Sequence, residues 1–211
     1  MPSDEGWAEG YRGGEMTEHQ PYDVVAQHPG FELRRYPAHL VAETVINGTF
    51  EGAGNKAFGA LAGYIGGRNR PGSKVAMTAP VTQEPAAEQV SAERIAMTAP
   101  VVQQNADLPG QYVVSFVMPA GSTEESLPEP LDPRVRLRTV GAELAAAHRF
   151  SGRWSKASYD AAAARLAEAV SAAGLTVAGP FRFARFNPPW TPWFLRRNEV
   201  VVPVSEGPAD A

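Results

Sequence analysis

The sequence predicts an α+β protein in which an antiparallel, barrel-like sheet carries two helices. Alternating apolar and polar residues, the pattern of half-buried strands, recur between Tyr22 and Val204. Two stretches, 50–66 and 152–174, change to a helical period. Both halves of the chain therefore have the order strand–strand–helix–strand–strand, which indicates two pseudo-repeats on one plan.

Three strands are predicted before the first helix, at residues 22–27, 31–36 and 39–47. The turn residues His28-Pro29-Gly30 separate the first two and indicate a hairpin. On the second strand, alternation places Arg35 on the same face as Phe31 and Leu33. The third strand is rich in β-branched side chains, which favour strands.

The helix predicted at 50–66 ends at Gly66-Gly67. Its apolar face consists of Phe50, Ala57, Phe58, Leu61 and Ile65. Four glycines inside it weaken the helix, each by roughly 1 kcal/mol relative to alanine. They indicate that another part of the chain packs very close to this helix.

The phrase AMTAPV occurs twice, at residues 76–81 and 96–101. It predicts two similar strands at about 74–82 and 94–103, and a further strand follows at 111–119. Met77 and Met97 have two interpretations. They belong to core strands that end at a proline-marked edge, or they form an adaptable wall against a flat ligand, with a weaker alternative as thioether ligands to iron.

A proline-rich connector covers residues 120–133, and the second half then repeats the order of the first. Its strands are predicted at 134–140, 142–151, 181–187 and 198–204. In the helix at 152–174, Ser155 is the expected N-cap and Gly174 lies beyond the end. The apolar stripe of this helix consists of Tyr159, Ala162, Leu166, Val170 and Ala173.

Composition limits the classes of function. The 211 residues carry a formal charge of −4, and the first twenty hold five acids and one arginine, so the rest is nearly neutral and gives no case for nucleic-acid binding. The absence of cysteine excludes disulfides and thiolate sites. No secretory signal or membrane-spanning run is recognisable. We expect a cytoplasmic protein with one domain at 21–204, comprising pseudo-repeats 22–119 and 134–204, and disordered tails at 1–20 and 205–211.

Three motifs, AMTAPV, GYIGGRN and RFNPPWTPWFLRRNEVVVPV, resemble the SOUL heme-binding protein family, especially its bacterial members. The resemblance covers nearly everything from Tyr22 to Val204. It implies a distorted antiparallel β-barrel with two flanking helices, similar to the small-molecule-binding domains of the gyrase-inhibitor-like group. Animal members bind heme and porphyrins, so the resemblance implies heme as the cofactor, in an apolar cleft between helix 50–66 and the sheet.

The predicted cleft is assigned six residues: Arg35, His39, Phe58, Lys74, Met77 and Trp190. Arg35 stands where one animal branch has its proposed axial histidine, so His39 and Met77 are the remaining candidate metal ligands. The Arg35 guanidinium suits a propionate, or it forms a structural ion pair with Glu199 or Glu43. Segment 187–199, which contains Trp190, is interpreted as a lid for a flat ligand or as a loop pinned against the barrel end.

Three functions are compatible with these residues. The first is a protein that buffers or carries a tetrapyrrole. The second is a module that binds hydrophobic small molecules without heme, cationic ones among them, in which Glu199 or Glu43 faces the ligand. The third is a heme-degrading enzyme, which would have to use the chemistry of its bound cofactor because the chain carries no enzyme signature. The implied partner is a porphyrin or another flat hydrophobic molecule.

Overall fold

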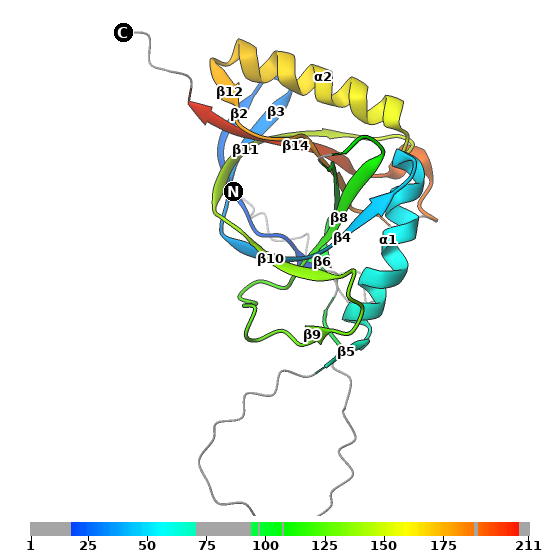
Figure 1. The fold of residues 1–211 in the computed structure, drawn as a ribbon. Helices are drawn as coiled ribbons and strands as arrows, with labels where there is room; N and C mark the ends of the chain where they lie inside the picture. Colours follow the sequence, from blue (N-terminus) through cyan, green and yellow to red (C-terminus); the bar gives the residue numbers. More distant parts are fainter. Residues whose placement is uncertain (1–17, 71–93, 97, 107, 188–189, 207–211) are drawn as a thin grey trace, which may run out of the picture.

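A computed structural model describes residues 18–70, 94–96, 98–106, 108–187 and 190–206 (Figure 1). The helices are α1 (Phe50–Ile65) and α2 (Lys156–Ala172), with a 3-10 turn η1 (Trp193–Leu195). The strands of the first half are β1 (Glu18–His19), β2 (Asp23–His28), β3 (Phe31–Tyr36), β4 (His39–Asn47), β5 (Asn69–Arg70), β6 (Thr98–Ala99), β7 (Val101–Asn105) and β8 (Gln111–Val117). Those of the second half are β9 (Glu129–Pro130), β10 (Arg136–Val140), β11 (Glu143–Phe150), β12 (Leu175–Val177), β13 (Arg182–Arg185) and β14 (Asn198–Glu206).

These elements confirm the predicted α+β class and most of the predicted segments. The hairpin of β2 and β3 turns at Gly30, whose φ of 92° lies in the left-handed region that glycine adopts without strain. Ser155 is the N-cap of α2, and its hydroxyl accepts from the backbone N–H of Ser158 at 3.3 Å. The first AMTAPV strand lies outside the described residues, and the second supplies β6 and the start of β7.

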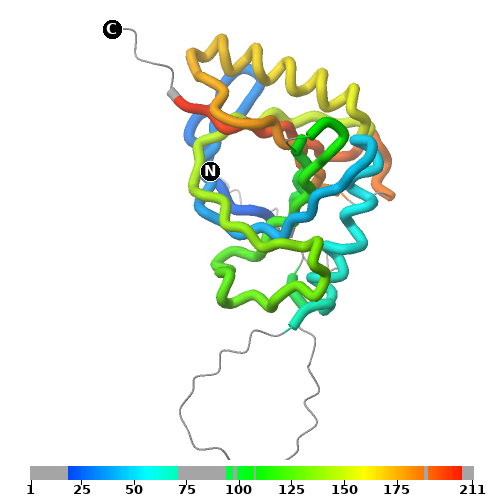
Figure 2. The backbone as a smooth tube through the Cα atoms, in the orientation of Figure 1, coloured from blue at the N-terminus to red at the C-terminus, as the bar shows by residue number. Residues whose placement is uncertain are grey.

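The predicted closed barrel is wrong. The large sheet has the order β10-β4-β8-β7-β13-β14-β11-β3-β2, with β12 beside β14. In the described part of the chain, no hydrogen-bonded pairing joins its two edges, β10 and β2. The sheet curls strongly all the same, and its strands surround an open centre when viewed end-on (Figures 1 and 2). Barrel closure came from the family resemblance, since alternation alone cannot tell a curled sheet from a closed one.

The sheet order is symmetric about the central pair of β7 and β13. Outward from this pair lie β8 and β14, then β4 and β11, then β10 and β3. The units β4-α1-β7-β8 and β11-α2-β13-β14 therefore occupy equivalent places, as expected of pseudo-repeats. The strand before each unit is exchanged, because β3 pairs with β11 and β10 pairs with β4.

The two helices cover the outer face of the curled sheet (Figure 1). Helix α1 packs on β4 and β8, and α2 packs on β11, β12 and β14. The main hydrophobic core lies in this layer, and its fully buried members include Leu61 and Tyr64 of α1, Tyr159 and Leu166 of α2, and Val200 and Val202 of β14. Because the core lies outside the ring of strands, the inner face is left for other side chains.

Helix α1 differs from its prediction at one position. Phe58 is 49% exposed and contacts Phe116 only by its edge, whereas Ala53, Ala60 and Tyr64 belong to the buried face. The predicted close approach at the glycines is present at Gly54, where an added Cβ would collide with the guanidinium of Arg185. At Gly59 an added Cβ would meet nothing.

These two glycines give a matched test of the packing around α1. We expect Gly59→Ala to raise the free energy of unfolding by up to ~1 kcal/mol, the difference in helix propensity. Gly54→Ala should lower it, because the buried Arg185 is held by Gln103 at 2.9 Å and cannot move freely. Urea unfolding measures both. Stabilisation by Gly54→Ala would contradict the described packing.

Candidate functional site

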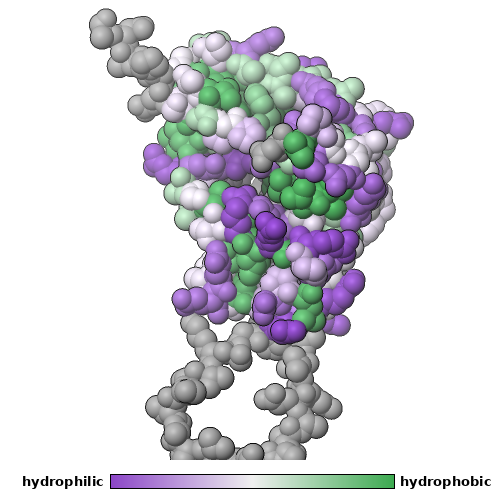
Figure 3. All heavy atoms as spheres, in the orientation of Figure 1, coloured by the Kyte–Doolittle hydropathy of each residue, from purple (hydrophilic) through white to green (hydrophobic). Residues whose placement is uncertain are grey.

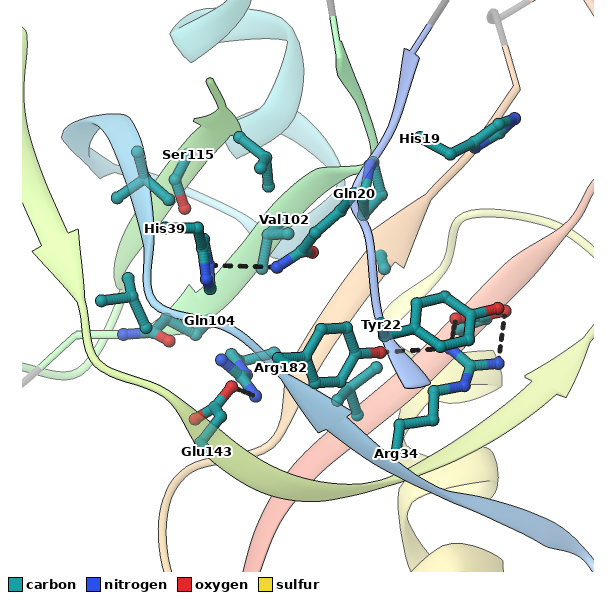
Figure 4. A pocket seen from close by; sticks show the side chains of 18 of the residues that line it. His19, Gln20, Tyr22, Arg34, His39, Val102, Gln104, Ser115, Glu143 and Arg182 are labelled. Atoms are coloured by element: carbon teal, nitrogen blue, oxygen red, sulfur yellow. Dashed lines mark hydrogen bonds and ion pairs between the residues drawn. The ribbon is translucent and has the colours of Figure 1, made fainter. Parts of the chain in front are cut away.

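The inner face of the sheet encloses a cavity of ≈ 570 Å³. Strict alternation decides which side chains face it. On β14, Glu199 and Val201 line the cavity, while Val200 and Val202 face the helices. The same alternation on the other strands brings polar and charged groups into the cavity wall (Figure 4). On the face of the molecule shown in Figure 3, hydrophilic and hydrophobic residues are intermixed.

A buried ionic cluster forms one side of the cavity. Arg34 of β3 donates to both carboxylate oxygens of Glu199, at 2.7 and 3.2 Å. Arg197 donates to Glu199 Oε1 at 2.7 and 3.0 Å. Glu32 and the Tyr36 hydroxyl complete the shell of Arg34. Two arginines thus share one buried carboxylate, and the planar guanidinium groups donate two hydrogen bonds each to its oxygens.

The cluster keeps its charges. Burial alone lowers the pKa of Arg34, but the hydrogen bond and charge of Glu199 outweigh it and raise the pKa above its usual value. The pKa of Arg197 is raised in the same way, by Glu199 against burial. Burial raises the pKa of the Tyr36 phenol, so that this hydroxyl stays protonated. With Glu32 beside Arg34, the cluster pairs two arginines with two carboxylates and carries no net charge.

His39 lies on the opposite side of the cavity wall, at the start of β4. Its Nδ1 is 3.0 Å from the carbonyl oxygen of Pro37, which can only accept, so Nδ1 carries the proton in the neutral ring. Its Nε2 lone pair then accepts from the Gln20 side-chain amide at 3.1 Å (Figure 4). Burial lowers the pKa of His39, which favours this neutral form.

Arg182 of β13 lies between these two sides and pairs with Glu143 at 2.5 Å. Within the part of the chain that the structure describes, its Nε is buried and has no hydrogen-bond partner. A buried donor without an acceptor is costly unless something else fills that role. The wall thus has an unused N–H group next to apolar side chains such as Val201 and Ala184.

Of the four predicted cleft residues that the structure describes, it brings His39 to the cavity. Phe58 lies on the outer side, on α1, and Trp190 is 81% exposed in the loop before β14. Arg35 is exposed on the outer face of β3. Lys74 and Met77 lie outside the described residues.

The predicted ion pair exists with a different arginine. Glu199 is the partner, but the buried arginine is Arg34, and Glu43 instead accepts from Arg138 at 2.9 Å. Arg34 shares its face with Glu32 and Tyr36, a row that alternation places opposite Phe31 and Leu33. The signal that could have found it is the tyrosine at the end of that row, since a large aromatic side chain rarely belongs to a fully solvated face.

Other features of the described residues are limited. No three histidine or acidic side chains come together there as a metal site would require. Nor does any helix in those residues have the length and apolar character to cross a membrane.

The comparison with known families decides the relationship. The sequence model of the SOUL heme-binding protein family matches residues 17–93 and 86–203. The chain belongs to this family. The two successive matches agree with the duplicated plan of the sheet. A comparison with curated proteins finds no match to the SOUL-family chain.

Solved structures share the fold at low identity. The C-terminal domain of EcmrR has a TM-score of 0.58 at 11% identity, covering 88% of this SOUL-family chain and 98% of that one. EcmrR in a DNA complex has a TM-score of 0.55 at 13% sequence identity, and the alignment covers 58% of the EcmrR chain. A hydrolase from Listeria innocua has a TM-score of 0.50 at 14% sequence identity, and the alignment covers 90% of this chain and 94% of the hydrolase. At these identities the likeness concerns the fold alone.

The ionic cluster predicts a large effect of Glu199→Gln on stability. We expect the free energy of unfolding to fall by about 3 kcal/mol, the lower end for breaking a buried pair, because Arg34 and Arg197 lose the carboxylate that they share while Arg34 keeps Glu32. Urea unfolding followed by tryptophan fluorescence measures the change. The matched acid-to-amide control is Asp160→Asn, which breaks an exposed pair with Lys156 and should have little effect. Equally small effects would contradict a structural role of the cluster.

The lowered pKa of His39 predicts a pH dependence of stability. Below about pH 6.5, the unfolded chain binds a proton at His39 that the folded chain does not. The free energy of unfolding should therefore fall as the pH drops towards the folded pKa. In His39→Asn this part of the loss disappears. Urea midpoints for both proteins at neutral and mildly acidic pH test this, and an unchanged pH dependence in the variant would refute it.

Proposed function

We propose that this SOUL-family chain binds heme or a related tetrapyrrole in the cavity on the inner face of its sheet, as a buffer or carrier. One observation carries the proposal: the cavity wall combines apolar side chains, a neutral histidine and arginine side chains. The volume of ≈ 570 Å³ lies within the range of small-molecule sites, roughly 300–1,000 Å³. Valines 41, 102, 117 and 201, from four different strands, offer the apolar contact that a flat ring requires.

The residues of the wall fit this group. His39 would be the residue to hold a heme iron, whose redox and ligand-binding chemistry the cofactor would supply, because a neutral imidazole nitrogen is a common protein ligand of heme. His39 holds the proton on Nδ1 through Pro37, so its lone pair is on Nε2, and Gln20 is the group that a ligand must displace. The Arg182 guanidinium borders the cavity, and its buried Nε, which has no partner among the described residues, could donate to a propionate if the side chain turned toward it.

The charged groups of the wall are paired on both sides. Glu199 accepts from two arginines and Glu143 pairs with Arg182, so a cation entering the cavity would meet no free carboxylate among these groups. Arg138 is paired as well, with Glu43. This pairing does not favour the module for cationic compounds. The wall gives no particular support to heme degradation.

The proposed site differs from the cleft predicted between helix 50–66 and the sheet. That interface is filled by the core, in which Leu61 and Ala53 are fully buried. Metal ligation by His39 is retained as part of the proposal. Contributions of Lys74 and Met77 stay predictions, because these residues are outside the described part of the chain. The proposed setting is the cytoplasm.

Titration with hemin tests the site. We expect saturable one-to-one binding with a Soret band, weakened roughly tenfold or more in His39→Ala, which corresponds to about 1.4 kcal/mol. Arg182→Ala should weaken hemin binding, because Glu143 loses its arginine partner and its carboxylate then repels the hemin propionates. The controls are Phe58→Ala and Arg35→Ala, which alter predicted cleft residues outside the cavity. Losses in the controls, with His39→Ala unaffected, would place the ligand on the helix side instead.

A further inference from the structure

The loop between β13 and β14 exposes a row of large apolar side chains. We call residues 190–195 the aromatic loop. Its four large apolar members and their exposed fractions are Trp190 81%, Trp193 51%, Phe194 58% and Leu195 66%. The part of the loop drawn in orange lies at the edge of the molecule, beside the start of α2 (Figure 1). The loop is separate from the tetrapyrrole cavity, whose wall includes none of these four residues.

Hydrogen bonds hold the aromatic loop in one shape. The backbone N–H of Leu195 donates to Pro192 at 2.9 Å, and Arg196 Nε donates to the Thr191 carbonyl at 2.8 Å. The carbonyl of Trp193 accepts from the N–H of Gly152 at 3.1 Å, which ties the loop to the start of α2. These hydrogen bonds fix the backbone of the loop, so the exposed side chains are held in an outward orientation. Such preorganisation lowers the entropy cost of binding.

Two arginines lie beside aromatic rings at the aromatic loop. Residues 169–198 contain four arginines and no acidic residue, but Arg182 and Arg197 line the cavity and Arg185 is buried. The positive charge at this surface therefore comes from Arg196 and from Arg153, which is exposed. The Arg153 guanidinium lies 5.9 Å from the Trp193 ring, and Arg196 lies over Trp154 at 4.1 Å. Exposed tryptophan, phenylalanine and leucine beside arginines are the side chains that proteins place at the interface of a bilayer with anionic lipids.

We propose that the aromatic loop docks the protein onto the surface of a lipid bilayer containing anionic lipids. Trp190, Trp193, Phe194 and Leu195 enter the headgroup region, and Arg153 contacts the lipid phosphates and carboxylates. A second protein fits less well on grounds of area. At roughly 150–250 Å² for a whole aromatic side chain, the exposed parts of the four residues offer less than the ~800 Å² per partner of a stable protein interface.

Vesicle co-sedimentation tests the proposal, with the full chain and no tetrapyrrole added. Phosphatidylcholine vesicles are compared with vesicles that also contain phosphatidylserine. We expect binding to the anionic vesicles, a blue shift of tryptophan emission, and weakening by added salt. The double change Trp193→Ser and Phe194→Ser should weaken binding by about tenfold or more. Arg153→Glu should reduce it on anionic vesicles only.

The matched control is Leu131→Ser, at a leucine that is 51% exposed in another loop, and it should bind as the unchanged protein does. Leu195→Ser is the second variant in case the double change impairs folding, which urea unfolding checks. The proposal is overturned if anionic vesicles do not bind the protein, or if Leu195→Ser and the double variant bind them unchanged. The proposal is also overturned if sedimentation shows that the protein dimerises through this loop as its concentration rises and that the dimer does not bind vesicles. Because hemin is absent, these outcomes are independent of the proposed tetrapyrrole site.

Discussion

The pairing of Arg34 with Glu199 is the interaction on which the inside of this molecule depends. It joins β3 of the first half to β14 of the second, across the intervening β11. Without Glu199, two arginines would face an enclosed space with Glu32 as their one remaining carboxylate partner, and such an arrangement is costly. With it, the inner face can carry charged groups while the hydrophobic core stays in the outer layer. The sheet can therefore surround a cavity and still be stably packed.

The sequence allowed the strands, both helices, the Ser155 cap and the duplicated order to be predicted, because all of these follow from local periodicity and capping. The curvature of the sheet could not be predicted in this way. Alternation shows that Arg34 and Tyr36 share a face, but the same pattern describes a face in water and a face around a cavity. Arg35 is a separate case. Parity correctly placed it on the face of Leu33, but its side chain is exposed there.

The candidate site was harder to predict than the fold. His39 was found because histidine is rare in this chain and suits iron, and chemistry of that kind can be read from the residue type. Arg182 and Gln20 were missed because their importance comes from neighbours distant in sequence, namely Glu143 and His39. Phe58 and Trp190 were chosen as aromatic side chains suited to a flat ring. Both side chains are exposed on the outside of the molecule and do not line the cavity.

The exchange of β3 and β10 between the two halves means that neither half contains all the strands of its own part of the sheet. Each unit of strand, helix and two strands is flanked by a strand that belongs to the other, as in a domain-swapped pair of subunits. The chain is in this sense an intertwined dimer whose two subunits have been joined by residues 120–133. The cavity is then the space between two interlocked subunits, and its wall must draw residues from both.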